Sequence, residues 1–568
     1  MPHVKVGDLI ATIALSIIAQ VAYGQICVSS DGNGDTACGS FTLSSPGTST
    51  LGDNSAFGYS ALFNNTTGSL NTATGSFALF KNTIGTSNTA LGYQALYGAP
   101  SPTWGTGSNN TAIGAGALYS FSTGGNNTAS GYQALYDNAA GSNNTASGYQ
   151  ALYDNAAASN NTAVGYQALY TNDTSAAGTA IYNTAMGSTA LFSNQNASNN
   201  TAVGYQALLT NDTSGGGNAN NNTAIGSNAL KDNQNGSNNT ATGSNALFSN
   251  DTENTGASGN TADGANAMNN NTSGNDNTAV GYQALHGSAS SGSYNTGIGM
   301  NALYSYSTGA YNTASGYQAL FKNKTGVQNT ATGVNALLDN TGGDFNTATG
   351  TDALEHNTSG KYNVALGYQA GTNVTTGSNN IEIGSPGVAG DSDAIRIGTI
   401  SSTNVPTQTF TYIAGIYNTP LSGNTVVVTS NGQLGVAAVS SERFKTAIEP
   451  MGSDTAKLEQ LRPVTFKLKT DANGTRQYGL IAEEVAKVYP ELVIRDENGH
   501  IDGVRYDELA PMLLNEMQKQ QQVNAAQAAK IDSLEQQVAK VDDLERQLAE
   551  MHAALVAIQS KDQLVAQR

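Results

Sequence analysis

The stretch NTASGYQALYDNAAASN, residues 144–160, is followed directly by NTAVGYQALY, residues 161–170, so the pattern that starts at Asn144 starts again at Asn161. The motif NTAxGxxAL begins nineteen times with some variation. Thirteen of the eighteen intervals equal the step from Asn144 to Asn161, and the others are one, four or five positions longer. A fixed period of this length indicates stacked copies of one small unit. The first positions are Asn54, Asn71, Asn88, Asn110, Asn127, Asn144, Asn161, Asn183, Asn200, Asn222, Asn239, Asn260, Asn277, Asn295, Asn312, Asn329, Asn346, Asn363 and Asn380.

The repeat is too short for a pair of helices, and Gly and Asn interrupt it every few residues. We therefore expect two short strands per repeat, near NTAxG and near YQAL, in a parallel β-roll or solenoid over residues 50–384. Disorder is the alternative for so polar a segment, but regular Ala, Leu and Tyr favour a fold. The side chains expected to point inward are Ala, Leu and the variable fourth residue, as in Ile113, Val164, Val203, Ile225 and Val280.

The longer repeats carry their extra residues after the AL segment, as in TNDTSAAGTAIY, residues 171–182. We expect these residues to form loops along one edge of a rod that is on the order of 90 Å long, at ~4.8 Å per strand layer. A row of tyrosines recurs in the YQA segments. Stacking between coils or chains is favoured over a carbohydrate-binding stripe. Its members are Tyr93, Tyr132, Tyr149, Tyr166, Tyr205, Tyr282, Tyr317 and Tyr368.

The charge distribution separates two parts of the chain. Charged residues make up 11% of it, against roughly 25% in an average protein. Sixteen of the 23 Lys and Arg follow residue 400. The net charge of -18 argues against binding to nucleic acid or anionic lipid, because both need basic patches. The five His residues are scattered and no nucleotide-binding fingerprint appears, so we expect no metal and no cofactor.

The N-terminus has the features of a secretory signal over residues 1–24, with an apolar run from Leu9 to Ala22 and small residues before a cut after Gly24. An uncleaved anchor is the alternative. We expect a secreted or surface-exposed bacterial protein with no further membrane-spanning segment. Within residues 25–49, Cys27 and Cys38 are the two cysteines of the chain. A disulfide between them is expected after export, and two unused thiols are the alternative.

The repeats resemble the head repeats of trimeric autotransporter adhesins, with Gly and Ala at set places but a longer period. The resemblance covers about residues 50–384 and implies a trimeric β-roll. After a β-rich connector at 385–439, charged residues return. Apolar residues at helical spacing predict a helix over 481–488 that ends before Pro490. Residues 491–506 predict a hairpin with its turn at 497–499.

Residues 440–511 carry four ordered motifs. The first comprises Ser440, Arg443 and Lys445, and the second runs from Leu461 to Phe466 with Pro463 and Val464. The third is Gly479 to Val485, which includes Glu484, and the fourth comprises Tyr506, Leu509 and Pro511. Together they resemble the C-terminal intramolecular chaperone of endosialidase-type phage tailspikes and bacterial fibre proteins, a serine auto-processing domain. Ser441 departs from the family pattern, which usually has Asp there.

The resemblance implies that the domain assists folding and trimerisation, and then cuts the chain between Val439 and Ser440. It assigns Ser440 as the nucleophile and Lys445 as the general base. The chemistry suits these residue types, because a serine hydroxyl needs a base and a neutral lysine amine can supply one. Without the resemblance, both would be ordinary surface residues at the start of a domain.

Residues 512–568 show heptads that predict a coiled coil. The positions a are Met517, Asn524, Ile531 and Val538, and the positions d are Leu513, Gln520, Gln527, Leu534 and Val541. After a slip of three residues the pattern continues through Leu544, Leu548, Met551, Leu555 and Ile558. The number three comes from the resemblance. A single amphipathic helix packed on its own domain is the alternative.

The expected function is an exported homotrimeric fibre, similar to a tail fibre or adhesin, with a self-cleaving folding domain. A host surface or a carbohydrate is its expected ligand. One alternative is a trimeric adhesin that does not cleave. Another is a polysaccharide-degrading tailspike, which would need paired carboxylates in a groove. Acidic residues such as Asp137 and Asp154 occur singly in the repeats, and no pair stands out from the sequence.

Overall fold

The computed structural model describes residues 28–29, 34–40, 42, 52–98, 105–251, 255–287, 290–399, 426–428, 433–436, 442–469, 474–495 and 499–566. The predicted signal segment 1–24, Cys27, Val439 and Ser440 lie outside these residues. The chain divides into two compact units, Met1–Thr409 and Phe410–Arg568.

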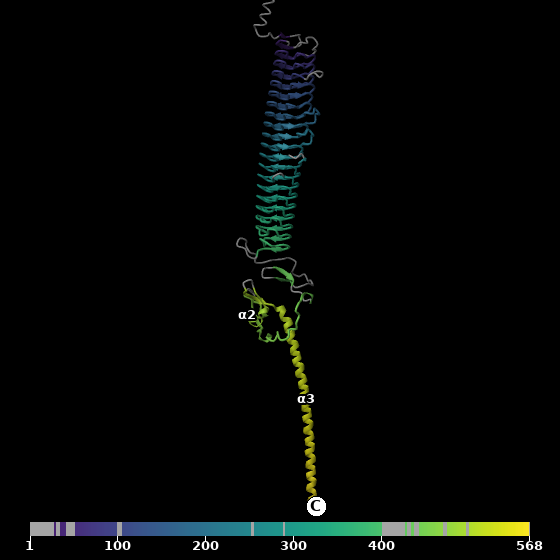
Figure 1. Cartoon of the computed structure of the whole chain (residues 1–568), viewed down its shortest axis with the longest axis vertical. Helices are drawn as coiled ribbons and strands as arrows, with labels where there is room; N and C mark the ends of the chain where they lie inside the picture. Colours follow the sequence, from purple (N-terminus) through teal and green to yellow (C-terminus); the bar gives the residue numbers. More distant parts are fainter. Residues whose placement is uncertain are drawn as a thin grey trace, which may run out of the picture. The chain divides into compact units, whose positions relative to one another are not determined.

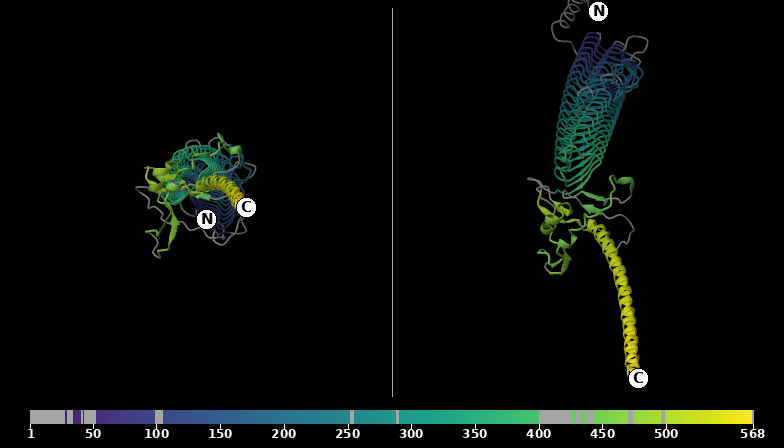
Figure 2. Two further views of the ribbon diagram at one scale, coloured as in Figure 1. Left: turned by 90° about the horizontal axis from the view of Figure 1, so that it is seen from below. Right: turned by 60° about the horizontal axis from the view of Figure 1, so that its bottom comes forward.

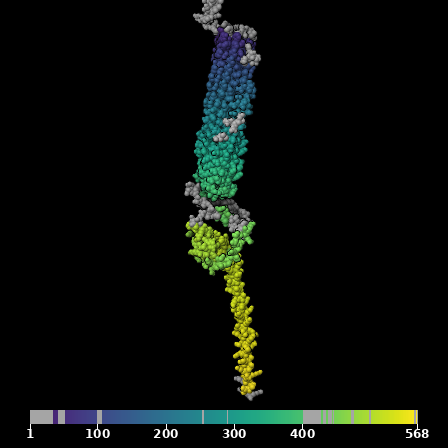
Figure 3. Space-filling model, viewed as in Figure 1, coloured from purple at the N-terminus to yellow at the C-terminus, as the bar shows by residue number. Residues whose placement is uncertain are grey.

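The first unit is a parallel β-solenoid, as the repeat period predicts (Figure 1). Each coil contributes one three-residue strand, and equivalent residues lie in register, as Thr145, Ala146 and Ser147 do with Thr162, Ala163 and Val164. The strands are β2 Thr36–Cys38, β3 Ser55–Phe57, β4 Thr72–Thr74, β5 Thr89–Leu91, β6 Thr111–Ile113, β8 Thr128–Ser130, β10 Thr145–Ser147, β11 Thr162–Val164, β12 Thr184–Met186, β14 Thr201–Val203, β16 Thr223–Ile225, β18 Thr240–Thr242, β20 Thr261–Asp263, β21 Thr278–Val280, β22 Thr296–Ile298, β23 Thr313–Ser315, β24 Thr330–Thr332, β25 Thr347–Thr349, β26 Val364–Leu366, β27 Ile381–Ile383 and β28 Ile395–Ile397. In the space-filling view, the coils form a continuous packed body (Figure 3).

The sheet extends past the predicted bounds of the repeat region at both ends. At its start β1, Val28–Ser29, pairs antiparallel with β2, and β2 pairs parallel with β3. At its end β28 pairs parallel with β27, with Ile381 opposite Ile395, so the last coil is shorter than the repeat. The shorter spacing hid this coil in the sequence, because the NTAxGxxAL motif is no longer present there.

The prediction of a strand at YQAL is wrong, because this segment is a turn. Gln150 and Leu152 have φ of 52° and 53°, in the left-handed region. Hydrogen bonds to the next coil stabilise this turn, such as the one from the Leu152 amide to the Ala168 carbonyl at 2.9 Å. A second short strand follows AL in six coils: β7 Ser120–Phe121, β9 Asp137–Asn138, β13 Ser193–Asn194, β15 Thr210–Asn211, β17 Asp232–Asn233 and β19 Ser249–Asn250.

The expected inward direction is correct for Ala and Leu and wrong for the fourth residue. Ala146, Ala151 and Leu152 are fully buried. The fourth residue points out, as Ile113 does with 43% exposure, because side chains alternate across a strand and the third residue, Ala, points in. The same holds for Val164, Ile225 and Val280, which are exposed, and Val203 is partly exposed.

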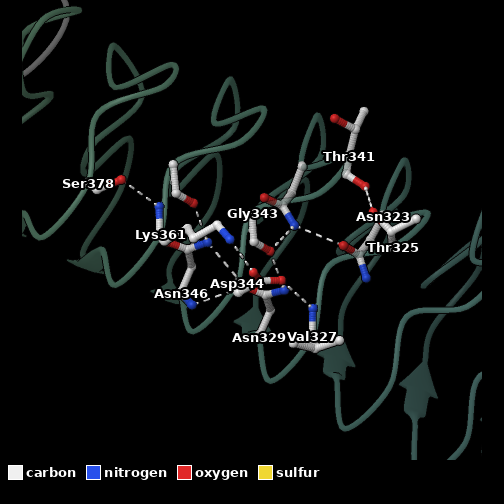
Figure 4. A network of polar contacts seen from close by, with 12 residues as sticks. Asn323, Thr325, Val327, Asn329, Thr341, Gly343, Asp344, Asn346, Lys361 and Ser378 are labelled. Carbon is white, nitrogen blue, oxygen red and sulfur yellow. Dashed lines mark hydrogen bonds and ion pairs between the residues drawn. The ribbon is translucent and has the colours of Figure 1, made fainter.

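The first Asn of each repeat fills the interior in place of the expected aliphatic residue. Asn346 shows the pattern (Figure 4): its amide donates to Oδ1 of Asn329 at 3.0 Å, and its Nδ2 donates to the Gly360 carbonyl at 2.8 Å. A second row of buried Asn lies at position twelve. Asn340 Nδ2 donates to Asn323 Oδ1 at 2.9 Å and to the Gly343 carbonyl at 3.0 Å. These rows pair most of the polar groups that burial would otherwise leave without a partner, with Asn82 Oδ1 and Asn357 Oδ1 of the second row as exceptions.

The second unit holds a small α+β region and one long helix. Its hairpins are β29 Val426–Val428 with β30 Leu434–Val436, β31 Val464–Phe466 with β32 Gln477–Gly479, and β33 Val493–Arg495 with β34 Ile501–Val504. Its helices are η1 Glu442–Phe444, η2 Leu458–Gln460, α2 Ala482–Val488, η3 Pro490–Leu492 and α3 Tyr506–Val565. The helix predicted at 481–488 and the hairpin predicted at 491–506 are both present. Figure 2 shows α3 as one continuous helix.

Candidate processing and assembly site

The predicted cleavage site is described only in part. Val439 and Ser440 lie outside the described residues, so no distance joins Ser440 to Lys445. Arg443 lies in η1, and the short helix ends one residue before Lys445, whose amide donates to the Glu442 carbonyl at 3.0 Å. The side chain of Lys445 is exposed. The turn therefore brings the chain back on itself directly after the predicted nucleophile.

The third and fourth motifs contact each other through Gly479 and Tyr506. The Leu480 amide donates a 2.7 Å hydrogen bond to the Tyr506 hydroxyl, which comes from the first residue of α3. A Cβ atom on Gly479 would lie 2.6 Å from that hydroxyl oxygen and 3.1 Å from a ring carbon of Phe466. The glycine is therefore needed for close approach, and it joins the second, third and fourth motifs at one point.

Glu484 connects the third motif to a residue that the sequence analysis did not single out. Its carboxylate accepts two hydrogen bonds from Arg462, at 2.5 Å from the guanidinium Nη2 and at 3.2 Å from Nε. Its pKa is lowered, first by this hydrogen bonding and also by the charges of Arg462 and Lys487. Arg462 is the variable residue of the Leu-x-Pro motif. Its position next to Pro463 was the sequence feature that could have pointed to it.

A buried threonine connects the start of the domain to the long helix. Thr455, 1% exposed, donates to Glu516 Oε1 at 2.5 Å, and it accepts from Asn515 Nδ2 at 2.5 Å and from Lys519 Nζ at 3.1 Å. Sequence reasoning missed this cluster, because nothing in the pattern relates residue 455 to residues sixty positions later. It fixes the first turns of α3 against the domain that precedes them.

The domain has a small apolar core and leaves much apolar surface open. The core consists of Val485, Tyr489, Leu492, Val493, Val504 and Leu509. Pro511 is exposed and stands inside α3, two residues after the buried Leu509. Beyond this point, the apolar residues of the predicted heptads are 46% to 65% exposed in the single chain: Leu513, Met517, Ile531, Leu534, Val538, Val541, Leu544, Leu548, Met551, Leu555 and Ile558.

Three of the eight tyrosines of the YQA segments, Tyr132, Tyr149 and Tyr166, stack between coils as predicted. The ring centroids of Tyr132 and Tyr149 are 5.2 Å apart, and those of Tyr149 and Tyr166 are 5.3 Å apart. A longer row at position ten, Tyr97, Tyr119, Tyr136, Tyr153, Tyr170 and Phe192, stacks at 4.9 to 5.0 Å. Because each stacked ring covers the face of the next, the faces inside these rows cannot serve as platforms for a sugar ring.

The solenoid register pairs two carboxylates that the sequence analysis treated as single. Asp137 and Asp154 occupy position eleven of successive coils and are bridge partners. Burial raises the pKa of both, and the charges of Asp137 and Asp173 raise that of Asp154 further. The pair lies beside the stacked rings of Tyr136 and Tyr153 and follows from the repeat itself, so we assign no activity to it.

The extra residues of two of the longest repeats form neighbouring loops, as predicted. Asp173 and Asp212 are buried at their bases, and Asp212 Oδ2 accepts from the amides of Asn196 at 3.1 Å and Gly217 at 2.9 Å. An open depression of about 590 Å³ with an uncharged lining lies between the loops, bordered by Ala177, Thr179, Asn196, Ser198, Gly215 and Asn220.

Cys38 is disulfide-bonded, and Cys27, its predicted partner, lies outside the described residues. Within the described ranges, no group of three or more His, Cys, Asp and Glu side chains could hold a metal ion. Among the helices that the structure describes, none combines the length and apolar character required to cross a membrane.

Comparison with known proteins identifies one part of the chain. Residues 440–494 match a family model described as chaperone of endosialidase. The match begins at Ser440 and covers the first three motifs, so the resemblance of this region to the family is confirmed. No curated protein and no solved structure matches the chain.

Proposed function

We propose that the protein is an exported, trimeric, tail-fibre-like protein whose C-terminal domain assists assembly of the solenoid and is then released by cleavage between Val439 and Ser440. The observation that carries this proposal is the match to the endosialidase chaperone family over residues 440–494, which follow a long β-solenoid and a connector in the sequence. The family description supports an assembly role, and the position of the match supports Ser440 as the first residue of the released domain.

The solenoid is a structure that benefits from such a domain. From β2 to β28 the strands pair in parallel with strands of neighbouring coils, and even at the shortest spacing, from Ile381 to Ile395, such a pair is not a local hairpin. Non-local pairing of this kind folds slowly and exposes unpaired edges that aggregate. A C-terminal nucleus that holds several chains together would raise their effective concentration and align them.

The long helix supplies the surface for that nucleus. The half-exposed apolar residues of α3 recur at heptad spacing, and this pattern favours a coiled coil with other copies of the chain. Gln520 Nε2 donates to Asn524 Oδ1 at 2.9 Å on the same helix. Both residues occupy predicted core positions, where polar side chains fix the register at a cost in stability.

The proposed cleavage uses residues of this chain alone. The Ser440 hydroxyl attacks the Val439 carbonyl while its proton passes to the neutral Lys445 amine. The amide C–N bond then breaks, and the proton is transferred to the departing Ser440 amine. Water hydrolyses the resulting ester, which leaves a carboxylate on Val439 and restores the Ser440 hydroxyl. The chain reversal at η1, between these two residues, is compatible with their approach.

The test is a denaturing gel of the full chain with Ser440→Ala, Lys445→Ala and, as matched control, Ser441→Ala. We expect two fragments from the wild type and from Ser441→Ala, and one full-length band from the other two variants. Mass spectrometry of the smaller fragment should give Ser440 as its first residue. A full-length wild-type band would refute cleavage and favour the non-cleaving adhesin. Sedimentation equilibrium of the Ser440→Ala variant should give three chains per particle.

Export is tested separately, because it rests on residues outside the described part. Mass spectrometry of the mature protein from the culture medium or cell surface should give Gln25 as the first residue. A chain that keeps residues 1–24 in the cytoplasm would contradict export without affecting the assembly role of the C-terminal domain.

A further inference from the structure

The outward side of the main sheet keeps the same strand register from coil to coil. We call it the strand face and define it by the side chains at positions two, four and six of each repeat, counted from its first Asn. In the repeats from Asn54 to Asn363, the insertions that lengthen some repeats all come after position nine. Equivalent strand residues are therefore stacked in register from coil to coil, as in Thr278–Val280 on Thr296–Ile298. In these repeats the sequence therefore places the inserted loops outside the strand face.

The strand face is also nearly free of charge, although the chain carries a net charge of -18. In the eighteen repeats from Asn54 to Asn363, Asp263 is its one charged residue. Charged side chains occupy other positions of the coil. Lys322 pairs with Asp339 at 2.8 Å in the row at position eleven, and Lys361 pairs with Asp344 at 2.7 Å in the row at position sixteen.

Large apolar side chains on the strand face are exposed in the single chain. At position four they are 37% to 51% exposed, and at position six they are 41% to 55% exposed. In eight of the eighteen repeats position four is Ser, Thr or Asp, so these apolar side chains form groups along the face that are separated by polar coils. Exposed apolar groups rimmed by polar residues mark an interaction surface. The position-four members are Phe57, Leu91, Ile113, Val164, Met186, Ile225, Val280, Ile298 and Leu366, and the position-six members are Tyr59, Tyr93, Tyr132, Tyr149, Tyr166, Tyr205, Tyr282, Met300, Tyr317, Val334 and Tyr368.

We propose that the strand face packs against the strand faces of other copies of this chain, so that the solenoids meet along it in parallel and in register. This inference rests on the self-association in the proposed function and names the surface that the solenoid contributes. Copies of an acidic chain repel each other. The strand face is nearly uncharged, so two copies can approach along it without bringing like charges together.

The heptad pattern of α3 supports other copies of this chain as the partners that cover the strand face. A parallel coiled coil of the α3 heptads would bring copies together side by side and in the same direction. In a closed symmetric particle of parallel chains, residues with the same number lie at the same height along the axis. A face of constant strand spacing fits such an arrangement, because every coil then meets the same coil of another copy, whatever side chains that coil carries.

Cysteine cross-linking on the full chain tests the proposal. Ile298→Cys adds a thiol on the strand face, and Thr308→Cys adds one to an exposed position of the same coil on another side. After mild oxidation, we expect a disulfide-linked dimer on a non-reducing denaturing gel for Ile298→Cys and monomer for Thr308→Cys. Peptide mapping should show residue 298 linked to residue 298.

Sedimentation of the same samples separates two kinds of failure. A trimer without the 298 cross-link, or with an equal Thr308→Cys cross-link, would overturn the strand-face interface and leave the proposed function intact. A monomer would overturn both. A charge variant gives an independent readout: Ile298→Lys should lower the midpoint of thermal unfolding of the solenoid clearly more than Thr308→Lys does. Equal midpoints would contradict the proposal.

Discussion

Glu382 lies in register with Arg396 of the following coil and with Ala365 of the preceding one, at the inward strand position that alanine occupies in most coils. Its side chain is fully buried. Arg396 donates two hydrogen bonds to the Asp391 carboxylate, from Nε to Oδ2 at 2.6 Å and from Nη2 to Oδ1 at 2.8 Å. Near the end of the solenoid, a buried carboxyl group thus takes the place of the inward-pointing alanine, and burial raises the pKa of that group.

The stability of this end of the solenoid should fall as pH rises. Burial raises the pKa of Glu382 to about 7 from an ordinary value of 4.5. A folded-state pKa above the unfolded value means that stability is fully present below pH 4.5 and is lost as pH rises through 7. We expect a loss on the order of 1–3 kcal/mol, reduced by any solvent access. Hydrogen exchange of residues 381–397 at pH 5 and pH 8 measures it.

The matched variant for this prediction is Glu382→Gln, which has a similar shape and does not titrate. Dividing wild-type exchange by variant exchange at each pH removes the intrinsic effect of pH on exchange chemistry. The ratio should rise between pH 5 and pH 8. A constant ratio would show that Glu382 has no raised pKa in the folded protein.

The row of buried Asn should be essential at each coil. Asn127 donates to Asn110 and to the Gly141 carbonyl, at 3.0 and 2.9 Å, and its Oδ1 accepts the Asn144 amide at 2.9 Å. Asn127→Ala leaves buried groups without partners, and we expect a loss of at least about 2 kcal/mol. The exposed neighbour Asn126 has φ of 61°, so Asn126→Gly is the control and should change stability by about 0.5 kcal/mol or less. Chemical denaturation measures both, and equal losses would contradict the structural role of the row.

The glycine at position five should not tolerate a side chain. Gly148 has φ of 140°, and a Cβ there would lie 2.3 Å from the Gly165 carbonyl oxygen of the next coil. Gly148→Ala should therefore cost more than about 3 kcal/mol, because the backbone stack must separate. Gly116 has φ of 65° and its nearest contact would be 3.4 Å away, so Gly116→Ala should cost about 1 kcal/mol. Comparison of their thermal unfolding tests the difference, which should disappear if neighbouring coils are not this close.

The contact between Gly479 and Tyr506 should appear as an energetic coupling. Gly479→Ala places a methyl group against the Tyr506 hydroxyl, whereas Tyr506→Phe removes that oxygen and its bond to the Leu480 amide. In the double variant the two losses should not add, with a coupling of at least about 0.5 kcal/mol. Tyr478, which is 77% exposed, provides the control Tyr478→Phe. Additive effects in denaturation of the Ser440→Ala chain would count against the contact.

The repeat period was sufficient to predict a parallel solenoid, but it could not assign an inward direction to each position. Because side chains alternate along a strand, Ala112 points into the solenoid and its neighbour Ile113 points out. From hydrophobicity alone, Ile113 would be expected inside and the polar Asn110 outside. Asn110 is buried because the next coil supplies its hydrogen-bonding partners, and a single repeat does not reveal that neighbour. The turn at YQAL was missed for the same reason, since its left-handed Leu is held by bonds to the following coil.

The C-terminal domain shows the opposite balance. Its helix at 481–488 and its hairpin were predictable from local patterns, and its similarity to the endosialidase chaperone family from ordered motifs. The long-range contacts were not, because Thr455 with Glu516 and Arg462 with Glu484 join residues that share no period. The pairing of Ser440 with Lys445 remains a prediction from the resemblance.

The stacking of identical coils makes the length of the fibre adjustable in whole steps. Removal of residues 127–143 as a block would place Asn144 on Asn110 at an unchanged repeat spacing, with the main sheet and the first Asn row continued. Recombination between neighbouring copies of the repeat in the gene produces deletions and duplications of this kind. Each event would change the reach of the fibre by one layer, about 4.8 Å, while its two ends stay the same.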